Sequence, residues 1–213
     1  MRIVVGMTGA TGAPLAVALL NALRRMEDVE THLVISKWAR ATIGLETALS
    51  VKEVAALADV VYQPGDQAAP ISSGSFHTDG MVIVPCSMKT LAGIRVGYAD
   101  GLLGRAADVM LKERRRLVLV PRESPLSEIH LDNMLALSRM GVRIVPPMPA
   151  FYNHPHTIDD LVDHAVARVL DQFGLTYDKA EPWTGLPHAR RNGLAAGDLP
   201  DDGLDRFGCV LAL

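Results

Sequence analysis

Five short apolar runs dominate the pattern of hydrophobic and polar positions along the chain. Most of them are continuous and rich in valine and isoleucine, and do not alternate with polar residues. Strands that are covered on both faces within a parallel sheet have this pattern. The runs occupy residues 3–5, 33–35, 81–84, 117–120 and 142–145.

Segments with helical periodicity lie between these runs, because apolar residues recur there at spacings of three and four. Their apolar faces comprise Leu15, Leu19, Ala22, Leu23 and Met26; Leu103, Ala106, Ala107, Met110 and Leu111; and Leu161, Ala165, Val169 and Phe173. The alternation predicts an α/β fold: a Rossmann-like (flavodoxin-like), three-layer, doubly wound parallel sheet. The less regular stretch 49–80 predicts a short helix, a possible further strand and a Gly/Ser loop.

Composition narrows the class of protein. A chain of 213 residues fits one α/β domain, and its net charge of −3, with acids and bases interspersed, argues against a nucleic-acid partner. No apolar stretch is long enough to span a membrane, and Met1 and Arg2 lead straight into a strand without a signal peptide. Cys86 and Cys209 match no metal or redox spacing, which favours a reduced, cytoplasmic setting.

The composition shifts near the end of the chain. From Pro182 the sequence is rich in glycine, aspartate, proline and arginine, which is typical of an extended or loosely ordered segment. We therefore expect one folded domain over residues 1–183 and a C-terminal tail over residues 184–213.

Polar residues follow every predicted strand. In open parallel sheets, ligands bind beyond the carboxyl ends of the strands, so one edge of the sheet is expected to collect glycines, hydroxyls, a thiol, cations and a carboxylate. A purely structural edge would not require so many polar groups. These segments are residues 6–12, 36–37, 85–90, 121–124 and 146–152.

The glycine segment after the first strand has two interpretations. Gly9 and Gly12 would let the backbone approach an anion, the next helix would offer its N-terminal amides, and Thr8 and Thr11 would add hydroxyl donors. Glycine turns also serve tight strand–helix packing. The segment alone leaves a phosphate or flavin site and a structural turn both open.

A dinucleotide-binding dehydrogenase is the nearest competitor, since T-G-A-T-G also opens many of those enzymes. Gly6, Gly9 and Gly12 are spaced by three, so the G-x-G-x-x-G order is missing. No acid follows the second strand to bind a ribose, and no tyrosine is followed four residues later by lysine. These absences weaken the dehydrogenase hypothesis.

The predicted helix at 101–114 carries a second candidate signal. Arg105, Asp108 and Lys112 share one face, opposite the apolar stripe. Two cations with an acid between them can bind a phosphate, or they can form a solvated, salt-bridged surface. Spacing favours the second interpretation. Cys86 is expected to be a buried, inert thiol, and His154 and His156 lack a third ligand for a metal.

Taken together, the polar segments resemble the UbiX family of flavin prenyltransferases, also called the Pad type or the B component of phenolic acid decarboxylase. The likeness runs from Met1 to about Trp183. It rests on long stretches in the right order, and the form Cys86-Ser87-Met88-Lys89-Thr90 looks most like the branch found in aromatic-acid decarboxylase operons. The stretches are GMTGATGAP (6–14), VISKWA (34–39), VPCSMKTLAGI (84–94), GRAADVMLKERRRLVLVPRESPLS (104–127), HLDNMLALSRMG (130–141) and MPAFYNHP (148–155).

This resemblance implies an activity. Members of the family have a Rossmann-like flavin fold, assemble as homododecamers and need no metal. They transfer the dimethylallyl group of dimethylallyl monophosphate to N5 of reduced FMN and then close a ring at C6. The product, prenylated FMN, is the cofactor of UbiD-type aromatic-acid decarboxylases, which are therefore the expected recipients.

The resemblance also implies site residues. Matching the FMN-binding positions are Gly9, Ala10, Thr11, Ser36, Ser87, Met88, Lys89, Thr90 and Arg122. Matching the surroundings of the prenyl phosphate are Arg105, Lys112, Tyr152, Arg168 and Trp183. The residues implied in catalysis are Glu123, Lys112, Thr11, Glu46 and Tyr152. Some family members have serine in place of Thr11, and the hydroxyl is kept.

These residue types suit the chemistry. Cations stabilise the charge that develops on a leaving phosphate, and Glu123 could relay a proton to the phosphate or accept one during ring closure. Two alternatives remain. A flavin-dependent decarboxylase of cysteinyl substrates would need a histidine after the second strand and an Asn-rich loop, and residues 36–46 and 85–89 contain neither. A non-catalytic decarboxylase subunit or flavin chaperone would need the same flavin loops.

Overall fold

The computed structural model describes residues 1–180. The predicted domain boundary at residue 183 and the predicted tail lie outside the described residues. The strands are β1 (Arg2–Met7), β2 (Glu30–Ile35), β3 (Val60–Tyr62), β4 (Gly80–Cys86), β5 (Arg116–Pro121) and β6 (Arg143–Ile144). The five apolar runs are thus confirmed as strands, and β3 is the further strand expected within 49–80.

Helices separate most of the strands, as the periodicity predicts. The α-helices are α1 (Ala13–Arg24), α2 (Lys37–Glu46), α3 (Val51–Ala55), α4 (Met88–Arg95), α5 (Leu102–Lys112), α6 (Glu128–Arg139) and α7 (Ile158–Asp171). A short 3-10 helix, η1 (Pro70–Ser72), lies in the predicted Gly/Ser loop region. Side-chain caps fix where several helices begin: Ser36, Ser87 and Thr157 each accept a hydrogen bond from a first-turn amide.

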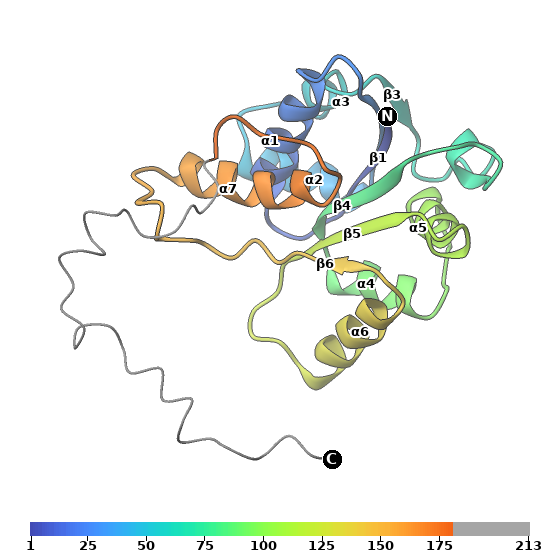
Figure 1. Ribbon diagram of the computed structural model, residues 1–213. Coiled ribbons are helices and arrows are strands. Elements are labelled where there is room, and N and C mark those ends of the chain that lie inside the picture. The colour runs from blue at the N-terminus through green and yellow to red at the C-terminus, as the bar shows by residue number, and fades with distance from the viewer. Residues whose placement is uncertain (181–213) are drawn as a thin grey trace. The chain divides into compact units, whose positions relative to one another are not determined.

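The strands form one parallel sheet in the order β3-β2-β1-β4-β5-β6. From β1 the chain winds outward to β3, and from β4 it winds outward to β6 in the opposite direction. The order reverses between β1 and β4, so this is the point of the sheet where a ligand is expected (Figure 1). The doubly wound α/β prediction is confirmed.

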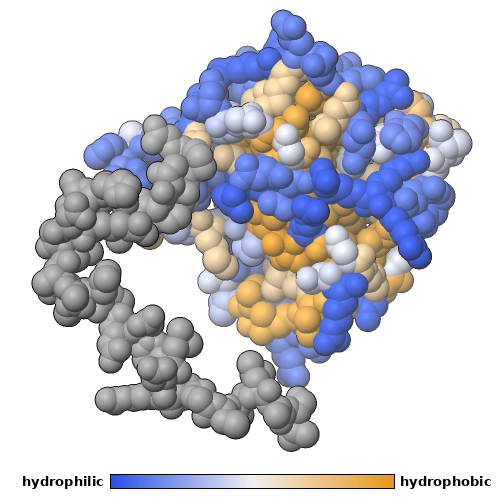
Figure 2. All heavy atoms as spheres, viewed as in Figure 1, coloured by the Kyte–Doolittle hydropathy of each residue, from blue (hydrophilic) through white to orange (hydrophobic). Residues whose placement is uncertain are grey.

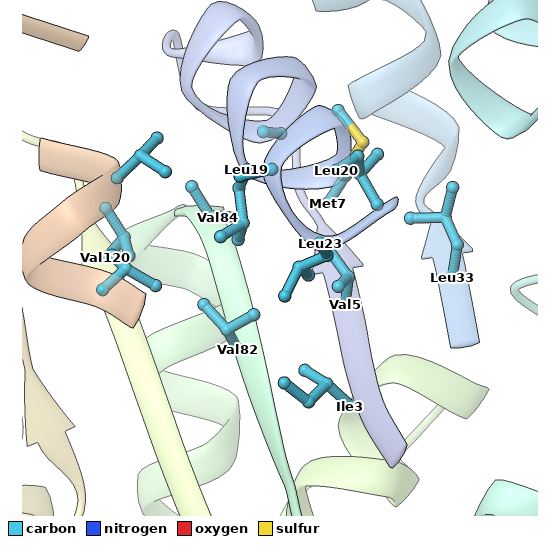
Figure 3. Packing of buried hydrophobic residues seen from close by; sticks show 14 of the residues in the cluster. Ile3, Val5, Met7, Leu19, Leu20, Leu23, Leu33, Val82, Val84 and Val120 are labelled. Atoms are coloured by element: carbon cyan, nitrogen blue, oxygen red, sulfur yellow. The ribbon is translucent and has the colours of Figure 1, made fainter. Parts of the chain in front are cut away.

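Helices cover both faces of the sheet and make three layers. On one face, side chains from β1, β4 and β5 point toward Leu19, Leu20 and Leu23 of α1 (Figure 3), and α2, α3 and α7 complete this cluster. On the other face, α4, α5 and α6 pack against the alternate strand residues. Leu23 is 1% exposed, so its replacement by alanine would cost about 2–5 kcal/mol of stability.

Not all apolar side chains are buried. The large exposed ones include Trp38, Leu45, Val96, Tyr98, Ile129, Leu131, Leu135, Met148, Phe151 and Ile158. Figure 2 shows apolar residues gathered on one face of the described part of the chain, among hydrophilic ones. Contiguous exposed apolar surface of this kind is typical of a protein–protein interface.

Candidate active site

The loops after β1 and β4 meet at the switch point and are joined by a buried threonine. The Thr8 hydroxyl donates a hydrogen bond to the carbonyl of Pro85 at 2.7 Å and accepts one from the amide of Ser87 at 2.8 Å. Thr8 is 3% exposed. Its hydroxyl, which the sequence suggested as a ligand donor, is therefore used to hold the two loops in register.

The N-terminus of α1 already carries an anion, and that anion belongs to the chain itself. The amides of Gly12 and Ala13 both donate to Oε2 of Glu46, each at 2.8 Å. Glu46 is the last residue of α2, which places its carboxylate over the start of α1. Gly12 has a φ of 118° and contributes no side-chain cap, so Glu46 caps this helix from outside it.

The surroundings of Glu46 favour its charged form. Partial burial acts to raise its pKa, but hydrogen bonds from the Thr11 hydroxyl and from the amides of Gly12 and Ala13, with the positive charge of Arg122, hold the pKa below its usual value. Glu46 is therefore a carboxylate at neutral pH. Thr11, Glu46 and Arg122 form one electrostatic group, although they come from three separate segments.

This group lines part of a cleft of about 610 Å³. The rest of the lining is mostly apolar and comes from the start of α1, from α7 and from prolines that follow β6. The lining residues are Thr11, Gly12, Pro14, Leu15, Glu46, Arg122, Pro147, Pro149, Ile158, Leu161, Val162 and Ala165. An apolar wall facing a few convergent polar groups is the usual construction of a small-molecule site.

Other residues predicted to bind FMN lie at the same edge of the sheet. Ser36 caps α2, and Ser87 caps α4, where its hydroxyl also donates to that of Thr90 at 3.1 Å. Lys89, in the first turn of α4, is exposed, whereas Met88 packs partly against the core. The carboxyl edge thus presents two serine-capped helix N-termini close to a lysine.

Gly9 is required by a close approach between segments. A Cβ on Gly9 would lie 2.3 Å from Cβ of Trp38, in the first turn of α2. The sequence left an anion site and tight strand–helix packing both open for this glycine, and the structure gives it a packing partner within the chain. Ala10, the next residue, is half-buried in the same loop.

The cations predicted to bind the flavin or the prenyl phosphate are divided between the two edges of the sheet. Arg122 follows the carboxyl end of β5, whereas Lys112 ends α5 just before the amino end of β5. The length of β5, about 20 Å, separates these two positions. Arg105 lies two turns before Lys112 on α5 and donates to the carbonyl of Ser72 at 3.0 Å.

Three of the four cations Arg105, Lys112, Arg122 and Arg168 have acidic partners in the described part of the chain. Arg105 pairs with Asp108, Lys112 with Glu113, and Arg168 with Asp171. Within residues 1–180, Arg122 forms no ion pair. The geometry of α5 therefore fits both the expected salt-bridged surface and a phosphate site. Of these four cations, Arg122 is the most available to a ligand.

Of the remaining predicted residues, Glu123, Tyr152 and Arg168 lie outside the cleft lining. Glu123 is exposed next to Arg122, and its carboxylate accepts a hydrogen bond from the amide of Ser124 at 3.1 Å. Tyr152 is 48% exposed and packs against His164. Arg168 is exposed on α7. Trp183 lies outside the described residues.

Sequence reasoning missed the apolar wall of the cleft. Leu161 and Ala165 belong to an apolar stripe that was interpreted as core, and Ile158 is 79% exposed. One signal in the sequence could have indicated this wall. Ile158 is a large apolar residue that directly follows the Thr157 cap, in the first turn of a helix, where a polar, solvent-exposed residue is expected.

Within residues 1–180, Cys86 and the histidines form no metal site. Cys86 is fully buried, and burial raises the pKa of its thiol far above the ordinary range, so it is unreactive as expected. Among residues 1–180 no cluster of histidine, cysteine and acidic side chains could hold a metal ion. In the same range, no helix has the length and apolar character needed to cross a membrane.

Comparisons with known proteins agree with this geometry. A family model described as Flavoprotein matches residues 1–170. A probable UbiX-like flavin prenyltransferase of Escherichia coli O157:H7 is 74% identical over 190 residues, which are 89% of this chain and 96% of the relative.

Two solved structures are similar throughout the described region. A dodecameric FMN-dependent UbiX-like decarboxylase from Escherichia coli O157:H7 has a TM-score of 0.86 at 74% identity, over 87% of this chain and 100% of the other. AnUbiX, in complex with FMN and dimethylallyl pyrophosphate, has a TM-score of 0.85 at 60% identity, over 87% and 98%. The chain therefore belongs to the flavoprotein family and, within it, to the UbiX-like flavin prenyltransferases.

Proposed function

We propose that this protein transfers a dimethylallyl group from dimethylallyl monophosphate to reduced FMN. The bond between C1 of the allyl group and the phosphate oxygen breaks, and a bond forms between that carbon and N5 of the flavin. A second bond, from the allyl group to C6, closes the new ring. The flavin gains one C5H8 unit: it gives up two protons, of which one is taken up by the double bond of the allyl group and the other by the departing phosphate, which leaves as hydrogen phosphate.

The observation that carries this proposal is the cleft at the switch point, in which Thr11, Glu46 and Arg122 face an apolar wall. An isoalloxazine is flat and largely apolar with a polar edge, so it matches such a cleft. A dimethylallyl cation needs the same environment, because water would quench it. The volume of about 610 Å³ is within the usual range for cofactor sites.

The charge of Glu46 indicates which way round the FMN binds. A phosphate at the N-terminus of α1 would lie beside a carboxylate that already holds the amides of Gly12 and Ala13. The N-termini of α2 and α4 instead carry Ser36 and Ser87, with Lys89 close by. We therefore place the phosphate at these two helices and the isoalloxazine beside Thr11 and Glu46.

The prenyl phosphate needs cations that one chain cannot bring together, because Lys112 and Arg122 lie at opposite edges of the sheet. A neighbouring subunit would supply Arg105 and Lys112 to the cleft of this chain. Tyr152, in the loop before α7, and Arg168, on α7, would complete the phosphate site. The exposed apolar surface supports such an assembly. We expect a homododecamer, as in the similar structure from Escherichia coli.

Roles for the remaining residues follow from their chemistry. Glu123 is exposed beside Arg122, where it would exchange a proton with the departing phosphate or take one during ring closure. The aromatic rings of Tyr152 and Trp183 would shield and orient the allyl cation. The product would serve a UbiD-type aromatic-acid decarboxylase, and both proteins would work in the cytoplasm.

The test is an anaerobic reaction of the purified full-length protein with reduced FMN and dimethylallyl monophosphate, followed by mass spectrometry of the extracted flavin. We expect a flavin heavier by one C5H8 unit. A parallel reaction with dimethylallyl pyrophosphate, the compound bound by AnUbiX, defines which donor is used. Unaltered FMN with both donors, together with tight FMN binding, would instead favour a non-catalytic flavin chaperone.

Variants test the assignment of roles. Lys112→Ala and Glu123→Ala should slow prenyl transfer while FMN binding persists, because neither side chain is placed against the flavin in this proposal. Loss of FMN binding in either variant would contradict these roles. Direct decarboxylation of an aromatic acid by the purified protein, without added decarboxylase, would contradict the proposed reaction itself.

A further inference from the structure

A buried histidine on α7 supports the ring of Tyr152. The centroids of Tyr152 and His164 are 5.8 Å apart, and the two ring planes meet at 83°. This edge-to-face geometry is the arrangement that aromatic pairs prefer. His164 is only 9% exposed, whereas Tyr152 is 48% exposed, so the histidine is the fixed member of the pair.

The support matters because of where Tyr152 lies. Residues 145–157 connect β6 to α7 and contain no helix or strand. In Figure 1 this connection is the long orange segment that leads into α7. A side chain in such a segment has no helix or strand of its own to hold it. The contact with His164 attaches the Tyr152 ring to a rigid helix.

The same helix carries a second predicted phosphate ligand. Arg168 follows His164 by four residues, which places the two side chains one above the other on α7. A ring that packs on His164 is therefore held within about one helical turn of the Arg168 guanidinium. Tyr152 and Arg168 are the two predicted prenyl-phosphate ligands in this part of the molecule.

We propose that His164 is a positioning residue, which holds Tyr152 next to Arg168 so that both can bind the phosphate of the prenyl donor. This inference rests on the proposed prenyl transfer. His164 does not itself touch the substrate and acts through the tyrosine ring. It contributes mainly to binding of the donor, because it fixes a ligand that contacts the donor before and during the transfer.

The experiment uses the full-length protein loaded with reduced FMN and varies the concentration of dimethylallyl monophosphate. His164→Leu fills the site with an aliphatic side chain and removes the ring edge. We expect KM for the donor to rise about fivefold and kcat to fall by less than about twofold, because the Tyr152 ring is still present to shield the allyl cation. His164→Phe restores the ring edge, so its KM should lie within about twofold of that of the original protein. The affinity for FMN should be the same in all three proteins.

A double-mutant cycle separates positioning from general packing. In a Tyr152→Ala background, His164→Leu should change KM by less than about twofold, because the side chain it positions is gone. His156→Ala is the matched control: this histidine is exposed at the start of the same helix and should leave KM unchanged. Thermal melting shows whether each variant is folded, and His164→Gln replaces the leucine variant if that one is not.

The outcomes distinguish this inference from the proposed function. An unchanged KM in the folded, ring-free variant overturns the positioning role, and so does an equal rise in KM with and without Tyr152. If the original protein produces no heavier flavin, the proposed function fails instead.

Discussion

The two edges of the parallel sheet carry clefts of nearly equal volume, about 620 Å³ at the amino edge and about 610 Å³ at the carboxyl edge, but their linings differ. The amino-edge cleft is strongly charged, and the carboxyl-edge cleft is mostly apolar. The amino-edge lining comprises Met1, Arg2, Glu27, Asp28, Val29, Glu30, Asp59, His77 and Asp79.

Much of the charge at the amino edge is used within the fold. Arg2 bonds Glu30 at 2.8 Å, and its amide bonds Asp79 at 2.6 Å, while Asp59 accepts hydrogen bonds from the amide and hydroxyl of Thr31. At the carboxyl edge, Arg122 forms no ion pair within residues 1–180, although its charge acts on Glu46, and most of the cleft lining is apolar. The comparison teaches that density of charge is a poor guide to a ligand site, because paired charges have little left to offer a ligand.

The sharpest test of this difference replaces one arginine at each edge. Arg122→Ala should lower kcat/KM for prenyl transfer by about 100-fold, because it removes a cation from the developing charge of the leaving phosphate. Arg2→Ala should leave kcat/KM within about twofold, although its lost ion pair lowers the melting temperature. Steady-state kinetics of both variants check this. An equal loss of kcat/KM in both variants would mean that the two clefts do not differ in their contribution to prenyl transfer.

A pair of glycines tests how tightly each edge is packed. Gly9→Ala should lower the free energy of unfolding by about 1–3 kcal/mol, because its Cβ would lie 2.3 Å from Cβ of Trp38, which belongs to a helix backbone that cannot move alone. Gly74→Ala at the amino edge meets only the flexible ends of Lys112 and Glu113, so we expect a change below about 0.5 kcal/mol. Urea unfolding at a fixed protein concentration measures both. A cost at Gly74 as large as at Gly9 would mean that the amino edge is equally rigid.

The sequence predicts most of the fold for a simple reason. Strands buried on both faces must be continuously apolar, so residues 81–84 and 117–120 could be identified without knowledge of their neighbours. The short β3 was harder to predict, because Val61 is 45% exposed and the strand lies at the edge of the sheet. Edge strands lack the two-sided burial that makes the pattern clear.

The candidate site was less predictable, because its geometry depends on tertiary contacts. The partner of the α1 amides is Glu46, which lies 34 residues away from Gly12 along the chain, and no local pattern links the two. The position of Lys112 could have been predicted. A helix that precedes a parallel strand must run back along the sheet, so its last residue lies at the amino edge. The spacing of residues along α5 predicts which face of the helix carries Lys112, but it does not show at which edge of the sheet that residue lies.

A third test concerns the buried histidine of the amino edge. His32 is 2% exposed and bonds Tyr62 and Glu30. Burial lowers its pKa, with Glu30 acting in the opposite direction. On acidification the unfolded chain therefore takes up the proton first, and stability falls as the pH drops below the ordinary histidine value of about 6.5, by at most about 1.4 kcal/mol per pH unit.

His32→Gln, which keeps hydrogen-bonding groups and does not titrate, separates this contribution from other groups. The stability advantage of the original protein over the variant should shrink between pH 7.5 and pH 5.5, measured by urea unfolding at fixed protein concentration. Prenyl transfer should be unaffected at pH 7.5, since His32 does not line the carboxyl-edge cleft. An advantage that grows on acidification would show that the buried ring accepts the proton.

The smallest effect is expected at Glu46, where stability and ligand binding meet at the carboxyl edge. Glu46→Gln keeps an acceptor for the amides of Gly12 and Ala13 and removes the charge at the helix N-terminus, so unfolding should become easier by about 1 kcal/mol at pH 7. The pKa of Glu46 is lowered in the folded protein, so its contribution is complete above the ordinary value of 4.5 and is lost as the pH falls through the lowered one. The difference between the two proteins in urea unfolding should therefore vanish in acid. Glu27→Gln is the control, because Glu27 is an exposed carboxylate of the other cleft, and this variant should unfold like the original protein at both pH values. An equal loss of unfolding free energy in Glu27→Gln would mean that general surface charge, and not the N-terminus of α1, accounts for the effect of Glu46.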